Sequence, residues 1–210
     1  MDYVLHIDLH LAGMVQQCGV WSYLVLFLIV FCETGLVITP FLPGDSLLFA
    51  VGIFAAHGSL SVTLAFSVLT VAAILGDTVN YWIGYLVGPR VFSSDRSRIL
   101  NRDYLRRTKR FYARHGAKTI VLARFAPILR TFAPFVAGVG RMDYGRFLVY
   151  NVIGGIVWVA LFVFGGYVFH DIPIVKEHFS LVVLVIIVVS ILPGVIELMK
   201  HRSARQKPSR

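Results

Sequence analysis

The chain has 210 residues, 57% of them hydrophobic and 15% charged, and its mean hydropathy of +0.76 is typical of an integral membrane protein. The apolar runs are long and continuous rather than alternating every second residue, which argues against a transmembrane β-barrel. The net charge of +9 comes mainly from one loop and one tail. This distribution indicates membrane topology, and no nucleic-acid partner is expected.

Residues 1–20 have mixed polarity and are expected to form a short interfacial helix. His6, Asp8 and His10 in this segment could suggest a metal site. Residues two apart on a helix point in different directions, however, so no metal ion is expected there. No cofactor is expected either.

Residues 21–56 form the first long apolar segment, which carries Glu33 and Asp45 and is interrupted by Pro40 and Pro43. Proline removes a backbone donor, and hydrocarbon tolerates the resulting break only where protein or a wet cavity satisfies the freed groups. The helical runs on either side are each too short to cross about 30 Å of hydrocarbon. We therefore predict a re-entrant helical hairpin.

Residues 60–88 are long enough for one tilted transmembrane helix. Small residues recur at every fourth position and predict a seam for helix packing: Gly76, Asn80, Gly84 and Gly88. Asp77 lies beside this seam. It is either a third acid within the membrane or a packing residue near the interface, and the sequence leaves both open.

The main block of charge is the loop 89–118, with ten Lys or Arg residues against Asp95 and Asp103. By the positive-inside rule this loop is cytoplasmic. Part of it has helical character, so we expect a basic amphipathic helix that contacts anionic lipid head groups.

Residues 119–141 form the second broken segment, which holds Arg124 and Arg130 and is interrupted by Pro127 and Pro134. An arginine at mid-bilayer costs about 2.5–3.5 kcal/mol, so two of them need partners or water. A plain spanning helix with an arginine snorkelling from each end is the alternative. We predict a second re-entrant hairpin, because the prolines leave no uninterrupted run of about twenty apolar residues.

The remaining sequence predicts two further transmembrane helices, at 146–169 and 179–199, and a basic cytoplasmic tail at 200–210. The fold expected for the single domain 1–210 is therefore an all-α integral membrane protein. It contains an inverted repeat of two hairpins, each followed by a transmembrane helix, plus a C-terminal transmembrane helix. The N-terminus falls on the outer side.

Two acids lie on one broken segment and two arginines lie on the other. The economical inference is that Glu33 and Asp45 meet Arg124 and Arg130, so that each charge offsets the desolvation of its partner. Arginine paired in this way still has donors left for a phosphate group.

Four stretches resemble the bacterial DedA (SNARE-associated, VTT-domain) family: FCETGLVITPFLPGDSLLF, GDTVNYWIG, ARFAPILRTFAPFVAG and YNVIGGIVW. The resemblance covers essentially the whole chain. It implies a bacterial protein of the cytoplasmic (inner) membrane, with several spans, that translocates polyprenyl phosphate or scrambles phospholipids, and proton coupling has been proposed for some members. The functional acids of the family fall on Glu33 and Asp45, and its functional arginines fall on Arg124 and Arg130.

The leading expectation is a translocase that returns undecaprenyl phosphate to the cytoplasmic leaflet, with Arg124 and Arg130 binding the phosphate. Glu33 and Asp45 would hold these arginines when the site is empty and carry the coupling protons. The alternatives are a phospholipid scramblase and an intramembrane lipid phosphatase. The phosphatase lacks a His/Asp arrangement at useful spacing, so the protein is not expected to be an enzyme. The oligomeric state stays open, with a homo-oligomer as one option.

Overall fold

The computed structural model describes residues 19–36, 44–91, 116, 118–125 and 127–172. Several sequence predictions lie wholly or largely outside these residues. They are the interfacial helix at 1–20, Pro40 and Pro43, most of the loop 89–118, the span 179–199 and the tail 200–210.

All regular elements in the described residues are α-helices, so the prediction of an all-helical chain is confirmed for this part. They are α3 (Val20–Gly35), α4 (Gly44–Ala56), α5 (Val62–Val91), α7 (Lys118–Ala123), α8 (Pro127–Val139) and α9 (Tyr144–Phe169).

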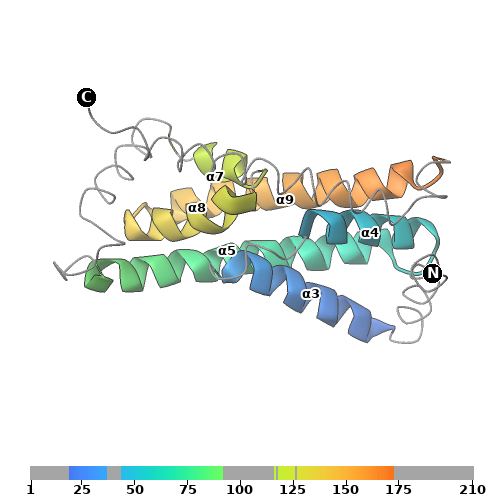
Figure 1. The fold of residues 1–210 in the computed structure, drawn as a ribbon, viewed down its shortest axis with the longest axis horizontal. Coiled ribbons are helices and arrows are strands. Elements are labelled where there is room, and N and C mark those ends of the chain that lie inside the picture. The colour runs from blue at the N-terminus through green and yellow to red at the C-terminus, as the bar shows by residue number, and fades with distance from the viewer. Residues whose placement is uncertain (1–18, 37–43, 92–115, 117, 126, 173–210) are drawn as a thin grey trace, which may run out of the picture.

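Two of these helices set the length of the molecule. Val62–Val87 of α5 and all of α9 are long and apolar enough to cross a membrane. They run in opposite directions along the long axis, and the four shorter helices lie against them (Figure 1). The C-terminal end of α3 and the N-terminal ends of α4 and α8 lie near the middle of this axis, with α7 close by.

The short helices pack on the long ones in a reciprocal way. Helix α3 packs on α5 and α4 packs on α9, whereas α7 packs on α9 and α8 packs on α5. Each long helix therefore carries one short helix from its own half of the chain and one from the other half.

Glycines allow close backbone contacts between helices of the two halves of the chain. A methyl group at Gly166 of α9 would lie 2.0 Å from the carbonyl oxygen of Phe49 in α4, and Gly52 faces α9 in the same way. At the other crossing, a methyl group at Gly138 of α8 would lie 2.0 Å from the carbonyl oxygen of Tyr81 in α5. Only glycine permits helices to approach this closely.

The predicted small-residue seam of α5 faces protein wherever its residues are described. Gly76 lies against α3, where a methyl group would be 1.9 Å from the hydroxyl oxygen of Thr34. Gly84 lies against the backbone of Phe135 in α8, and Asn80 between them is fully buried.

The backbone of the second broken segment differs from the prediction at one proline. Helix α7 ends at Ala123, residues 124 and 125 form a turn, and α8 begins at Pro127, where a missing N–H costs nothing. Pro134 lies inside α8, so the prediction that it breaks the segment is wrong. Proline removes only one donor, and packing of α8 on α5 supports the helix around it.

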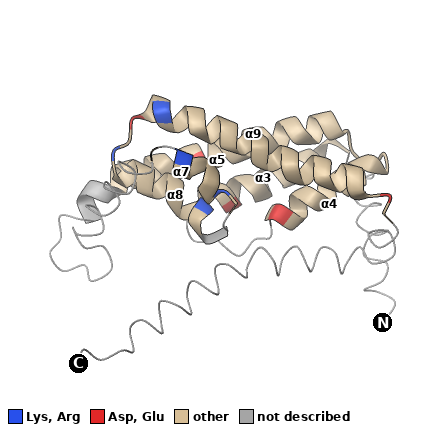
Figure 2. Ribbon diagram, turned by 90° about the horizontal axis from the view of Figure 1, so that it is seen from above, with Lys and Arg blue, Asp and Glu red and all other residues tan. Residues whose placement is uncertain are grey.

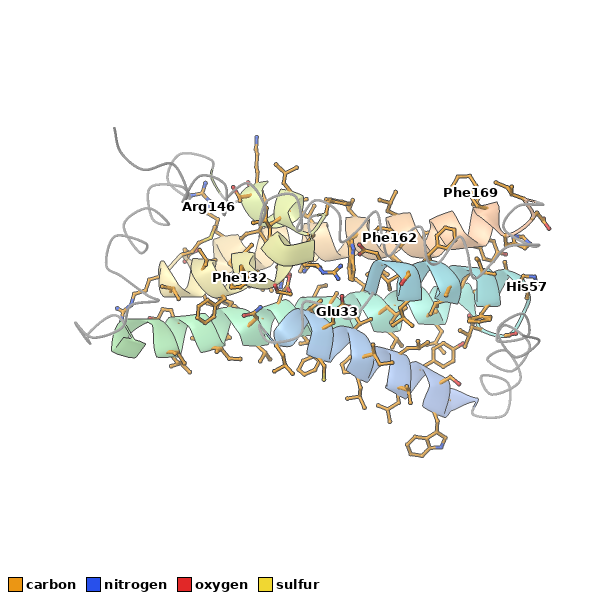
Figure 3. The ribbon with its side chains drawn as sticks, in the orientation of Figure 1. Glu33, His57, Phe132, Arg146, Phe162 and Phe169 are labelled. Carbon is orange, nitrogen blue, oxygen red and sulfur yellow. The ribbon has the colours of Figure 1, made fainter. Side chains whose placement is uncertain are left out.

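The surface differs from that of a soluble protein, although the interior is largely apolar as well. Large apolar side chains are exposed along the long helices and α3, including Trp21 at 70% and Leu161 at 56%. Buried charged residues lie where the short helices approach the middle of α5 and α9, and other charged residues lie at the ends of the bundle (Figure 2). Figure 3 shows Glu33 near the middle of the long axis, with His57 and Phe169 toward one end.

Candidate functional site

Five buried charged residues come together at the ends of the short helices. Glu33 is in the last turn of α3 and Asp45 is the second residue of α4. Arg124 directly follows α7, and Arg130 is the fourth residue of α8. Asp77 lies midway along α5. The ends of these short helices therefore bring charged side chains from residues 21–56 and from residues 119–141 to one place, at half the length of the long helices.

Arg130 is the centre of the first cluster. Its guanidinium donates to Glu33, and its Nη1 lies 2.7 Å from Oδ1 of Asp45. The side chain of Glu33 is fully buried and that of Arg130 is 6% exposed. The prediction that the two acids meet an arginine of the second segment is thus seen at Arg130, which contacts both.

Trp158 of α9 completes this cluster. Its indole Nε1 donates to Oδ1 of Asp45 at 2.9 Å, and its ring lies 5.1 Å from the guanidinium carbon of Arg130. The same Asp45 oxygen therefore accepts from both an arginine and a tryptophan. A cation over the face of an indole ring is stabilised by the ring quadrupole, most strongly when both groups are buried.

Gly44 fixes the carboxylate of Glu33. Its backbone N–H donates to Oε1 of Glu33 at 3.1 Å, and a methyl group at Gly44 would lie 2.0 Å from Oε2. The first residue of α4 thus lies directly against the acid at the end of α3. The free N–H groups at a helix N-terminus favour a negative charge at this place.

Arg124 has different partners from those predicted. Within the described part of the chain it donates to Oδ2 of Asp77 and to Oδ1 of Asn151, rather than to the two acids of residues 21–56. The reason is geometric: Arg124 precedes the break and faces α5 and α9, whereas Arg130 follows it and faces α3 and α4. Asp77, for which the sequence left two options, is a buried acid in an ion pair.

Asn80 holds two of the converging elements together. Its Nδ2 donates to the carbonyl oxygen of Thr34 at 3.1 Å and to that of Thr131 at 2.7 Å. Thr34 lies at the end of α3 and Thr131 directly follows Arg130 in α8. One amide therefore ties the backbone carrying Glu33 to the backbone carrying Arg130.

The ionised groups of this site do not balance in charge. Three carboxylates and two guanidiniums are buried here, which leaves one negative charge in excess when all are ionised. Nε of Arg124 and Nε of Arg130 donate to no described residue. Buried charges without full compensation each cost several kcal/mol, so such a cluster is a candidate functional site.

Sequence reasoning missed Trp158 and Asn151 as site residues. Both lie in YNVIGGIVW, a stretch that carried the family resemblance but has no charge to draw attention to it. An asparagine two turns before a tryptophan in an apolar helix was the available signal, since two turns put both on one face.

Comparisons with known proteins place these residues in a family. The VTT domain matches residues 42–168, which include Asp45, Asp77 and both arginines. The chain is 54% identical over its whole length to Protein DedA of Escherichia coli, covering 97% of that protein. No solved structure matches.

More distant relatives carry membrane-protein names. An uncharacterized membrane protein of Mycobacterium tuberculosis is 40% identical over 90% of this chain and 86% of its own length. The inner membrane protein YqjA of Escherichia coli is 34% identical over 74% of this chain and 71% of its own length. The chain belongs to the DedA family of VTT-domain membrane proteins.

Proposed function

We propose that this protein moves a lipid phosphate across the bacterial cytoplasmic membrane, with undecaprenyl phosphate as substrate. One observation carries the proposal: two buried arginines, each with an Nε–H that no described residue accepts, lie half-way along the two membrane-length helices. The planar guanidinium matches the geometry of a phosphate and binds it bidentately. A buried arginine at mid-membrane marks a pathway for a substrate or an ion.

The architecture we propose for this transport is an inverted repeat. In it, α3–α4 and α7–α8 are re-entrant hairpins that enter from opposite sides, and α5 and α9 are the spans that follow them. The reciprocal packing of α4 on α9 and of α8 on α5 supports this arrangement. The basic loop and tail then lie in the cytoplasm, with the loop on anionic head groups.

Binding proceeds by exchange of anions. In the empty site Glu33 and Asp45 hold Arg130, and the incoming phosphate replaces them. The N-termini of α4 and α8 add N–H groups that favour an anion. The polyprenyl tail stays in lipid along exposed apolar side chains of α8, such as Leu129 and Phe132.

The excess negative charge supports proton coupling. One proton on Glu33 or Asp45 would balance the remaining two carboxylates against the two guanidiniums, and the acid that takes it up would weaken its hold on Arg130. The role we propose is that of a transporter rather than an enzyme.

Transport in proteoliposomes tests this proposal. Undecaprenyl phosphate placed in one leaflet should cross only when protein is present, and a proton gradient should raise the final asymmetry. Phosphatidylglycerol, measured in the same vesicles, is the control for general lipid passage. Equal passage of both lipids, independent of the gradient, would identify a scramblase, and no passage of either would refute the proposal.

A further inference from the structure

One segment of α9 contacts both arginines of the site. Asn151 and Trp158 are seven residues apart, which is about two helical turns, so they lie on the same face. Asn151 contacts Arg124, and Trp158 contacts Arg130. Neither residue is charged, and the exchange of anions proposed above does not use either of them.

The amide of Asn151 is fixed at both ends. Its Nδ2 donates to the carbonyl oxygen of Ile74 in α5 at 3.0 Å, and its Oδ1 accepts from Arg124. Because the Nδ2 contact lies on the neighbouring helix, the acceptor oxygen must face the arginine. Asn151 is fully buried, so no water competes for this oxygen.

The helix backbone between the two residues makes room for Arg124. A methyl group at Gly154 would lie 3.0 Å from Cδ and 3.1 Å from Nε of Arg124, and one at Gly155 would lie 3.6 Å from its Nη1. The arginine therefore lies flat against α9, and the glycines allow its guanidinium to reach Asn151.

Trp158 fixes the other arginine through two contacts. Its ring lies 5.1 Å from the guanidinium carbon of Arg130, and its Nε1 donates to the Asp45 oxygen that also accepts from Arg130. The indole is 1% exposed. When a phosphate replaces Asp45, the ring remains as a partner of the guanidinium.

We propose that Asn151 and Trp158 are positioning residues for phosphate recognition. Asn151 orients Arg124 and Trp158 orients Arg130, so a single helix sets the separation of the two guanidiniums. Arg130 then keeps its place while its anionic partners change. The inference deepens the proposed function and rests on it for the identity of the ligand, but not for the orientation of the arginines.

Side-chain NMR of the empty protein in detergent micelles tests the orientation directly. The Nε–H order parameters of Arg124 and Arg130 are measured in Trp158→Leu and in Asn151→Leu. We expect a crossed result, in which the first change loosens Arg130 alone and the second loosens Arg124 alone. Trp82→Leu is the matched control, because Trp82 is 42% exposed on α5 and should leave both arginines ordered.

Conservative variants keep the test usable if a leucine variant does not fold. Trp158→Phe retains an aromatic face without the indole N–H, and Asn151→Asp retains the acceptor oxygen. Each should preserve more arginine order than the corresponding leucine. If both arginines stay ordered in all variants, or if order falls only as the protein unfolds, Asn151 and Trp158 are packing residues and the inference fails.

Affinity for farnesyl phosphate, with farnesol as the uncharged control, gives the second measurement. In Trp158→Leu the ligand has to order the loosened Arg130 side chain, and this ordering cost should weaken binding by up to roughly tenfold. Unchanged affinity in a variant with a loosened arginine would overturn the link to recognition. If the wild type does not prefer farnesyl phosphate but the crossed NMR result holds, the orientation stands and the proposed function fails.

Discussion

Replacing Glu33 by glutamine, alone and together with an arginine variant, tests which arginine forms an ion pair with this acid. Oε1 of Glu33 accepts from Arg130 and from the N–H of Gly44, and the side chain is fully buried. Glutamine keeps an acceptor there but loses the charge, and charge-assisted hydrogen bonds are roughly twice as strong as neutral ones. Since a hydrogen bond to a charged group contributes about 1.5–3 kcal/mol, the free energy of unfolding should fall by about 1 kcal/mol.

Arg130→Gln should cost more, about 3–5 kcal/mol, because it leaves Glu33 and Asp45 as two buried carboxylates without their cation. In the double variant, Glu33→Gln removes one of these carboxylates. The combined loss should therefore be smaller than the sum by about 1–3 kcal/mol. Glu33→Gln combined with Arg124→Gln should add to within about 0.5 kcal/mol, because Arg124 contacts Asp77 instead.

Reversible unfolding in mixed micelles with increasing dodecyl sulfate, followed by far-ultraviolet circular dichroism, measures all these free energies. The two double variants serve as controls for each other, because they share Glu33→Gln and differ only in the arginine. Stronger coupling of Glu33 to Arg124 than to Arg130 would refute the pairing. Strict additivity in both would show that the ion pair does not contribute to stability.

Three further predictions concern the ligand, the packing and the topology. Arg130→Lys keeps the charge but loses the planar fork, so affinity for a polyprenyl phosphate should fall with stability retained, and equal loss of both would remove the case for a phosphate ligand. Gly166→Ala should destabilise by about 1–3 kcal/mol or more, since its methyl group would meet a carbonyl oxygen at 2.0 Å. Gly165→Ala, whose nearest atom is 4.0 Å away, should be neutral or stabilising by up to about 1 kcal/mol, and similar thermal midpoints in the two would contradict this. Single cysteines on a cysteine-free background should be labelled from outside at position 171 (Asp171) and not at 107 (Arg107), and the reverse labelling would reject the topology.

The meeting of charges could be predicted from the sequence because its physical basis is strong. Carboxylates and arginines in broken apolar segments are too costly to leave unpaired, and this alone predicts that the acids of residues 21–56 meet an arginine of residues 119–141. Pairing at Arg130 follows this logic. The partner of Arg124 could not be predicted, because it depends on the direction in which the chain leaves α7, and desolvation cost does not distinguish Asp77 from the other acids.

The sequence did not identify the polar residues of α9 as part of the site. Asparagine can hydrogen-bond between transmembrane helices and tryptophan can anchor a helix at the interface, so neither Asn151 nor Trp158 indicates a site until its neighbours are known. Pro134 was misjudged for a related reason. Proline in an isolated helix is disruptive, but one in a helix packed along α5 is tolerated.

The long sequence separation of the ion pairs has a consequence for how this protein is made. Arg130 follows Glu33 by 97 residues and Asp45 by 85. At a synthesis rate of about 5–20 residues per second, the segment that carries Glu33 and Asp45 waits roughly 5–20 s for the cation that neutralises its two carboxylates. It cannot settle at its final depth before then without bearing their desolvation cost. Insertion of this chain into the bilayer and its tertiary folding are therefore one coupled event, completed only when the second half of the chain has emerged.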